Sequence, residues 1–412
     1  MWYSLLPIAC IFFCFCCLKC LKSVLTCAPI QMMGHPKKMP DFITLFNMSS
    51  VKKTRVAFVF SAFLIVSTFA NHSSSEGKVA SGHPEATHEA SNSHDKPAKY
   101  EPGKMIMDHV TDAHDWHLFG EGHETVSISL PVILYVNSKG LINFSSANFQ
   151  HGHAAYKGFI LNKMGSVVWE DETNTEAIYD ISITKNVLAM MLAVLVLMII
   201  TIGMARSYSK RQGKAPKGFH NLVEPLILFI RDDVARASIG NKADKYLPML
   251  LSIFFFIFVN NIFGLIPIFP GGANVTGNIA VTMVLAVIVF LTVNLNANKY
   301  YWKHIFVPDV PVWMYIIIIP IEILGVVLKP FVLMLRLFAN ITAGHIIILG
   351  FFSLIFIFGA MKPGLGLAVS PLSVAFTVFM SLLELLVAFL QAFVFTLLTA
   401  IYIGSAIEEH HH

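Results

Sequence analysis

Residues 322–345 read EILGVVLKPFVLMLRLFANITAGH. Apolar side chains dominate this stretch, and a run longer than about 20 such residues predicts a helix that crosses a lipid bilayer. The stretch also holds four ionisable side chains: Glu322, Lys329, Arg336 and His345. Because an ionisable group inside a membrane is costly, each one is a candidate for function. The stretch therefore predicts both a membrane fold and the place of its working site.

The composition extends this prediction to the rest of the chain. Of 412 residues, 55% are hydrophobic and only 13% are charged, against about 25% charged in an average soluble domain. Further apolar runs predict about five spans, near residues 186–205, 246–268, 278–297, 330–358 and 371–405. The net charge of +4 is modest, and its lysines and arginines flank the spans. Nucleic-acid binding therefore has no support.

Three segments beside the spans are predicted separately. Residues 219–244 mix apolar side chains with charged ones, which is typical of a helix at the membrane surface. Residues 308–330 are apolar but contain Pro311 and Pro320, so we expect a short bent or re-entrant helix before the fourth span. The segment 361–371 is expected to be a loop. The fold class is therefore an all-α polytopic membrane protein with about five transmembrane helices plus an interfacial or re-entrant helix.

The N-terminal part has a different composition. All six cysteines lie between Cys10 and Cys27, so the body uses no thiol or disulfide chemistry. This stretch could be a membrane anchor or a palmitoylation site. Alternatively, it is part of an over-extended start, because Met48 begins a segment with the layout of a signal peptide. We expect six parts: a cysteine-rich or over-extended segment 1–47, a signal peptide 48–70, a flexible histidine-rich linker 71–104, an extracytoplasmic region 105–185, a membrane domain 186–408, and a tail 409–412.

The extracytoplasmic region is predicted to contain short strands. Between about 125 and 184, β-branched and aromatic runs alternate with turn-forming residues. The region also carries two histidine pairs, His114 with His117 and His151 with His153. Metal binding and ordinary structural hydrogen bonding both stay open, and the second is favoured because neither pair completes a ligand pattern.

The basic connection RSYSKRQGK at 206–214 predicts the orientation. Short basic loops stay in the cytoplasm, so the region before the first span is expected outside and the C-terminus inside. Together with the signal peptide, this predicts a multi-pass protein of a bacterial inner membrane.

Counting residues from the connection between the last two spans predicts two polar layers. Arg336 and Gln391 fall at similar depth, near mid-membrane. His345 and Glu384 fall together in a layer nearer the outside. Since nine residues turn a helix by about 900°, His345 is expected to face away from Arg336.

The two layers suggest different chemistry. Arginine stays protonated, so Arg336 can serve only as a fixed positive charge that favours ionisation of a nearby carboxylate. A histidine and a carboxylate at one depth form a plausible proton relay. Small residues predict a closely packed partner on the Arg336 face: Gly325, Ala339, Ala343 and Gly344.

Simpler interpretations stay open for the same residues. Glu322 and Lys329 could reach the cytoplasmic surface with their charged ends. Arg336 could form a structural ion pair with Glu384. The amides of Asn260, Asn261 and Asn340 could join neighbouring helices by hydrogen bonds.

Three motifs resemble subunit a of the F-type ATP synthase. They are the run from Glu322 to Asn340 followed by Gly344-His345, the run from Glu384 to Gln391-Ala-Phe, and NNIFGLIP at 260–267. The resemblance covers about residues 185–410. In one respect the chain departs from the best-known bacterial pattern, where the glutamate comes first and the histidine second. Here His345 comes first and Glu384 follows.

The resemblance implies a role for each candidate. Arg336 would match the stator arginine that faces a rotating ring of c subunits, each of which carries one proton on a carboxylate. His345, Glu384, Asn340 and Gln391 would line or support an outer half-channel, and Glu322 an inner one. The implied partners are the c-ring, the b subunits of the peripheral stalk, other ATP synthase subunits and the lipid bilayer.

The leading hypothesis is therefore a non-catalytic subunit that conducts protons within a rotary ATP synthase. No phosphate-binding glycine loop occurs in the sequence, and no cofactor is expected. The resemblance implies that the surroundings of the ring carboxylate decide whether H⁺ or Na⁺ is the coupling ion. We expect H⁺. A proton-coupled secondary transporter and a purely structural scaffold are the alternatives. The first predicts an internal repeat, which the two halves do not show.

Overall fold

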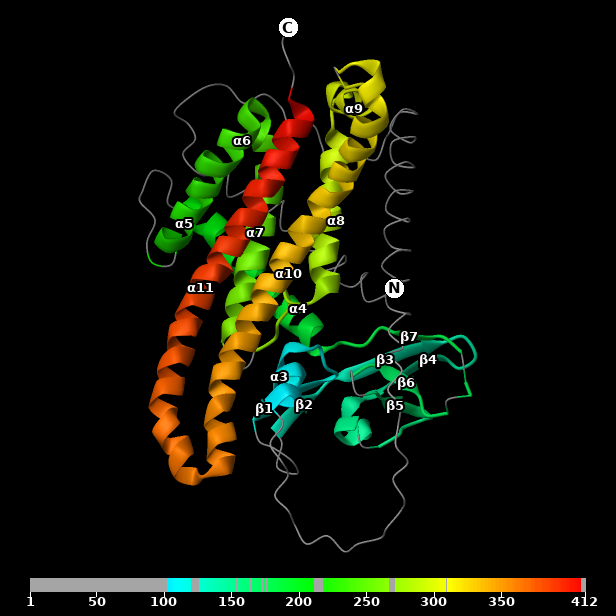
Figure 1. Ribbon diagram of the computed structural model, residues 1–412, viewed down its shortest axis with the longest axis vertical. Helices are drawn as coiled ribbons and strands as arrows, with labels where there is room; N and C mark the ends of the chain where they lie inside the picture. Colours follow the sequence, from blue (N-terminus) through cyan, green and yellow to red (C-terminus); the bar gives the residue numbers. More distant parts are fainter. Residues whose placement is uncertain are drawn as a thin grey trace, which may run out of the picture.

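The structure is a computed structural model of the chain (Figure 1). It describes residues 102–119, 126–152, 154–162, 165–171, 173–174, 176–210, 218, 220–266, 271–308 and 310–408. The expected segments 1–47, 48–70 and 409–412, and nearly all of 71–104, lie outside the described residues. Within these ranges, five helical segments are long and apolar enough to cross a membrane. The expected polytopic helical fold is therefore confirmed.

The first two segments follow the sequence pattern closely. Helix α4 spans Lys185–Lys210 and has apolar side chains all round, as a helix in lipid requires. The expected surface helix is α5 (His220–Phe229), the π-helical turn η5 (Ile230–Arg236), α6 (Ala237–Ile239) and the 3-10 turn η6 (Gly240–Lys242). Gly240 has a φ of +68°, a value that favours glycine, and there the chain turns into α7 (Ala243–Leu265).

The remaining body contains one short and three long helices. Helix α8 spans Ile279–Asn296, and the Asn278 side chain caps its N-terminus by accepting a hydrogen bond from the Ala280 N–H. Helix α9 (Lys299–Phe306) and the 3-10 turn η7 (Val312–Met314) lead into α10 (Tyr315–Met361). Helix α11 (Pro363–Ile407) returns beside it.

Two expectations about α10 and α11 are wrong. The expected separate helix at 308–330 is the first part of α10, which continues through Pro320 and Pro330 without a break. The expected loop at 361–371 shrinks to Lys362, because Pro363 already opens α11 at a position where its missing N–H costs nothing. The two helices form a tight antiparallel hairpin, which stands out in Figure 1.

In its described residues, the strand-containing region comprises α3 (Pro102–Val110) and seven short strands. Strands β1 (Asp115–Phe119) and β2 (Val126–Ser129) pair, as do β5 (Phe159–Leu161) and β6 (Val167–Trp169). The three-stranded sheet has the order β4-β3-β7 and consists of β3 (Pro131–Val136), β4 (Gly140–Ser145) and β7 (Ile178–Asp180). A 3-10 helix, η4, spans Ser146–Gly152. The predicted strands are thus confirmed.

This region is joined to the helices by side chains as well as by the chain itself. Trp116 is 2% exposed and belongs to the main hydrophobic core, together with Ala189 and Met190 of α4. Helix α3 packs against α10. We call this end of the molecule the strand end, and the opposite end, where α11 stops, the C-terminal end (Figure 1).

The main core lies where α7 meets α11. Phe254 and Phe258 of α7 contact Phe389 of α11 edge to face, with ring centroids 6.0 and 5.8 Å apart. The buried face of α11 recurs every three to four residues and is rich in small side chains: Ala388, Ala392, Thr396, Thr399, Ala400 and Ala406. Small side chains let helix backbones approach closely. This packing fixes the depth and the face of each polar residue on α11.

Candidate functional site

The central contact of the site joins the hairpin helices. The Nδ1 nitrogen of His345 on α10 is hydrogen-bonded to the Oε1 carboxylate oxygen of Glu384 on α11. The side chains are 15% and 5% exposed, respectively. Counting residues placed them in one layer, and this placement is confirmed. Because they also touch, a proton can pass directly between the imidazole and the carboxylate.

Gly344 makes room for this contact. A Cβ at position 344 would lie 2.8 Å from the Glu384 carboxylate oxygen and 3.1 Å from its carboxyl carbon. Real Cβ atoms do not approach other atoms so closely. We had expected Gly344 to make room for a partner helix on the Arg336 face. Instead, it makes room for the Glu384 side chain of the same chain.

The second ring nitrogen of His345 points toward α7. Nε2 is buried and has no hydrogen-bond partner among the described residues. It faces Gly264, where a Cβ would lie 3.5 Å from Nε2 and 3.4 Å from the Ala273 carbonyl oxygen. The imidazole thus sits between a carboxylate on one side and a glycine on the other.

An asparagine ties three elements together beside this histidine. The Asn261 amide donates to the Ala388 carbonyl on α11 over 3.1 Å and accepts a 2.6 Å bond from the Thr276 hydroxyl. The predicted interhelical role of Asn261 is confirmed. Asn260 instead donates to Phe256 within its own helix. Sequence patterns cannot reveal the Thr276 contact, because it depends on how residues 271–278 fold back over α7.

Arg336 lies near the middle of α10 and is exposed at the surface of the chain. Among the described residues, no carboxylate lies within 4 Å of it, so the alternative of an ion pair with Glu384 is wrong. Since the helices are antiparallel, the nine residues from His345 back to Arg336 lead to about residue 393 on α11. Gln391, which is buried, lies two residues from that level. His345 and Arg336 face different sides, as their spacing predicted.

Arg336 belongs to an exposed row on α10. Its successive levels are three or four residues apart, and two of its members, Ala339 and Asn340, are adjacent; the row contains Val332, Arg336, Ala339, Asn340 and Ala343. Apart from the arginine, its side chains are small or medium in size, so a neighbouring helix could approach the backbone closely. Asn340 is thus not buried between helices of this chain.

The Glu322 layer lies on the other side of Arg336, toward the C-terminal end. Glu322 is half-buried and lies near Tyr301 of α9. Burial, with the charge of Glu322 as a second cause, raises the pKa of Tyr301 to about 12. The Lys329 ammonium lies 5.7 Å from the centre of the Tyr402 ring. Lys329 therefore has an aromatic contact within the chain, and the charge of Glu322 acts on Tyr301. No sequence pattern indicates either tyrosine.

His114 is structurally bonded within the strand-containing region. Nε2 donates to Asp180 over 3.0 Å and Nδ1 donates to the Gly165 carbonyl over 3.1 Å. Burial alone would lower the pKa of His114, but its bonds to Asp180 and the charges of Asp180 and Asp112 raise it. No cluster of three metal-ligating side chains occurs in the described part of the chain. The His117 and His151 side chains and the whole of His153 lie outside that part.

Asp112 joins this region to the first span. Its carboxylate accepts hydrogen bonds from the Asn186 N–H and the Thr184 hydroxyl, at 3.1 and 2.8 Å, and so caps the N-terminus of α4. Burial raises the pKa of Asp112, and these bonds oppose that effect.

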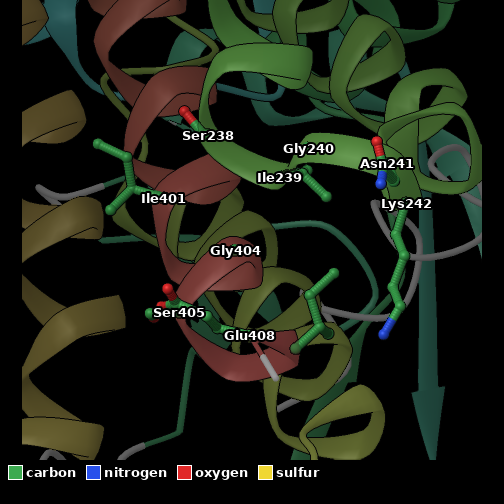
Figure 2. A pocket seen from close by; sticks show the side chains of 10 residues that line it. Ser238, Ile239, Gly240, Asn241, Lys242, Ile401, Gly404, Ser405 and Glu408 are labelled. Carbon is green, nitrogen blue, oxygen red and sulfur yellow. The ribbon is translucent and has the colours of Figure 1, made fainter. Parts of the chain in front are cut away.

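A pocket of about 520 Å³ lies away from these residues, at the C-terminal end. Figure 2 shows it between the turn from Ser238 to Lys242 and the last turns of α11. A Cβ at Gly404 would overlap the Ser238 carbonyl oxygen, so the glycine permits this close packing. The pocket contains none of the residues singled out from the sequence.

Fold and site together define a class of protein. The chain is a multi-pass membrane protein that carries an exposed arginine at mid-helix and a buried histidine-glutamate pair toward the strand end. Proteins that move ions or protons within the membrane carry such residues.

Comparison with known proteins identifies the family. Residues 187–404 match the family model "ATP synthase A chain", and residues 105–187 match a model for a domain of unknown function. The chain belongs to the ATP synthase A chain family. It is thus a membrane-sector subunit of an ATP synthase.

Three similar proteins carry the name ATP synthase subunit a or subunit a 2. ATP synthase subunit a of Chloroherpeton thalassium is 44% identical over 240 residues, which are 57% of this chain and 69% of that protein. ATP synthase subunit a 2 of Chlorobaculum tepidum is 46% identical over 55% of this chain and 64% of its own length. ATP synthase subunit a of Chlorobium phaeobacteroides is 46% identical over 56% of this chain and 68% of its own length.

Proposed function

We propose that the chain translocates protons as the stator subunit of a rotary F-type ATP synthase. In this proposal it forms two half-channels against a ring of c subunits and couples proton flow to rotation of the ring. It takes no part in the chemistry of ATP itself.

The observation that carries this proposal is the exposure of Arg336. A guanidinium keeps its charge in lipid, where an unpaired charge is costly. Within the described chain it has no carboxylate partner. A carboxylate from another subunit would satisfy it, and the row of small side chains around it would admit that subunit's helix.

The other polar residues fall on two sides of this charge. His345 and Glu384 would deliver protons from the strand end, with Gln391 and Asn340 between them and Arg336. Glu322, beside Tyr301, would release protons toward the C-terminal end. Arg336 would keep the two routes apart, because a fixed charge repels a proton on the direct path.

The orientation follows from the basic connection at 206–214. We propose that the strand end lies outside a bacterial inner membrane and the C-terminus in the cytoplasm. The b subunits of the peripheral stalk would be further partners.

The test is Arg336→Ala in membranes that carry the whole complex. We expect ATP synthesis driven by a proton gradient to fall to background, because nothing would then draw a ring carboxylate into its ionised form. Lys362→Ala removes an exposed cation at the hairpin turn and serves as the matched control with normal synthesis.

The same experiment separates the alternatives. A self-contained transporter would still move protons after removal of the c-ring, whereas a stator subunit would not. Normal coupled synthesis in Arg336→Ala would support a scaffold and rule out the proposed role.

A further inference from the structure

The pocket at the C-terminal end has two walls of different chemistry. Its volume is about 520 Å³, within the range of roughly 300–1,000 Å³ that is typical of ligand sites. One wall is the turn from Ser238 to Lys242, and the other is the last turns of α11 (Figure 2). Polar and apolar side chains line both walls, so the pocket is a candidate binding site separate from the residues of the proposed proton route.

The α11 wall changes from apolar to charged along its length. Three exposed side chains lie on it at intervals of four and three residues, and so share one face of the helix: Ile401, Ser405 and Glu408. From Ile401 to Glu408 the helix rises by about 10 Å, and Ser405 places a hydroxyl between them. A phospholipid has the same order of chemistry, from acyl chain through the polar ester region to a charged headgroup.

The pocket lies where apolar helices end. Helix α7 begins at Ala243, directly after the turn, and α11 ends at Ile407. The Asn298 side chain closes this end of α11 by donating to the Ile407 carbonyl over 2.7 Å. Because apolar membrane helices end near the level of the lipid headgroups, we expect headgroups beside this pocket.

The pocket also brings one cation and one anion together. Lys242 directly precedes α7, and Glu408 directly follows α11. Figure 2 shows the Lys242 side chain extending along the pocket toward the end where Glu408 lies. The start of a helix attracts anions and its end attracts cations, so each helix end reinforces the side chain beside it. The Glu408 carboxylate forms no ion pair with the described residues, so it can accept a cation from a ligand.

These two charges favour a zwitterionic headgroup. A phosphate would bind Lys242 and an ammonium would bind Glu408, each in charge-assisted hydrogen bonds. The Asn241 amide makes no hydrogen bond to another described residue and could donate to the same phosphate. A primary ammonium donates three hydrogen bonds, whereas the quaternary ammonium of phosphatidylcholine donates none. Phosphatidylglycerol carries the phosphate but no cation.

We propose that this pocket binds the headgroup of phosphatidylethanolamine from the leaflet at the C-terminal end. In this site Lys242 binds the phosphate, Glu408 binds the ammonium, and Ile401 contacts the first part of an acyl chain. The inference goes beyond the proposed function and requires only that this end of the chain lies at a membrane surface. A bound lipid would join the turn to α11 and so support the close contact between Ser238 and Gly404.

The test is photolabelling of the whole purified complex in detergent. The probe is phosphatidylethanolamine with a diazirine near the ester end of one acyl chain, and mass spectrometry locates the labelled peptides. We expect label in residues 238–242 and 401–408. Unlabelled phosphatidylethanolamine should displace the probe at a concentration about tenfold lower than phosphatidylcholine or phosphatidylglycerol, because each of these lacks one charge-assisted contact.

Two variants separate the two charges. Lys242→Ala should weaken the binding of all three lipids about tenfold, because all three carry the phosphate. Glu408→Gln should weaken the binding of phosphatidylethanolamine alone, since only its primary ammonium donates to the carboxylate. Lys299→Ala and Asp233→Asn remove exposed charges outside the pocket and are the matched controls, with unchanged binding.

Several results would overturn the assignment. They are label confined to other segments, equal effects of Glu408→Gln on the three lipids, and unchanged binding in both pocket variants. Label in the isolated chain but not in the complex would also overturn it, because a neighbouring subunit would then cover the pocket. If the variants do not assemble, the unaltered complex decides. A preference for phosphatidylethanolamine at these peptides supports the site, and equal displacement by the three lipids refutes it.

Failure here is distinguishable from failure of the proposed function. Arg336 does not line the pocket, so Arg336→Ala should leave the labelling unchanged whatever its effect on ATP synthesis.

Discussion

Gly344 and Gly350 lie on the same helix but differ in what surrounds them. A Cβ at Gly344 would press on the Glu384 carboxylate, whereas a Cβ at Gly350 would meet nothing within 4 Å. We expect Gly344→Ala to push Glu384 away from His345 and to lower proton-driven ATP synthesis by about tenfold or more. Gly350→Ala should leave the rate unchanged. The measurement is synthesis by membrane vesicles with equal amounts of assembled complex.

A second variant gives this prediction its control. Shortening the acid in Gly344→Ala/Glu384→Asp would make room for the new methyl group and should restore part of the rate. Equal activity of the Gly344 and Gly350 variants would show that the carboxylate tolerates displacement.

For single residues, the sequence predicted their depth along the helices better than their side-chain contacts. Counting along two antiparallel helices placed His345 with Glu384, because helical rise is constant. It could not show that Asn261 bonds Thr276, since the fold of the segment 271–278 has no periodic pattern. It also could not show that Nε2 of His345 faces Gly264, because that depends on the crossing of α7 and α10.

Among the helices, α10 shows where propensity reasoning fails. Pro311 and Pro320 predicted a short bent or re-entrant helix before the fourth span, since proline removes a backbone N–H and usually kinks a helix. Helix α10 begins after Pro311 and continues through Pro320 and Pro330. In lipid a broken helix exposes polar backbone groups that nothing can satisfy, so one lost hydrogen bond is preferable to an open turn.

The contact of α6 with α11 gives a prediction at the scale of elements. Gly404 lies against the Ser238 carbonyl, which a Cβ would overlap. Gly404→Ala should force the two helices apart and lower the free energy of unfolding by about 1–3 kcal/mol, as for other overpacked sites. Thermal unfolding of the purified chain in detergent measures this effect.

The control is Gly203→Ala on α4, where a Cβ meets nothing within 4 Å. It should be neutral or slightly stabilising, since alanine favours helix over glycine. Equal melting temperatures for the two variants would contradict the close contact seen at Ser238.

Across the whole molecule, the strand-containing region is fixed to the helices at several points. Asp112 caps α4, Trp116 enters the main core, and α3 packs on α10. The sequence predicted the spans and strands, because each follows from a local pattern. It gave no indication of this docking, which depends on surfaces that are distant in the chain.

His114 should make the stability of this region depend on pH. Its pKa in the folded state is raised, so its contribution is fully present below about pH 6.5, the ordinary value, and is lost as pH rises through the folded value. Backbone hydrogen exchange in β3 and β7 of the full-length chain, corrected for the intrinsic effect of pH, should therefore be faster at pH 9 than at pH 6.

His114→Gln should remove this dependence, because the amide does not titrate. His304→Gln on α9, at the opposite end, is the control and should retain it. The raised pKa of Asp112 acts in the same direction but from a lower ordinary value, near pH 3.8. Protection that does not change with pH in the unaltered chain would contradict the assignment to His114.

The hairpin is longer than the hydrocarbon layer of a bilayer is thick. At about 1.5 Å per residue, the 47 residues of α10 reach about 70 Å, whereas the hydrocarbon layer is about 30 Å thick. To remain in lipid throughout, the pair would have to slant by roughly 65° from the normal. The exposed row around Arg336 would then run obliquely across the membrane. An upright helix of a neighbouring subunit that moves past would cross that row at an angle. It would lie beside the arginine for only a short part of its path.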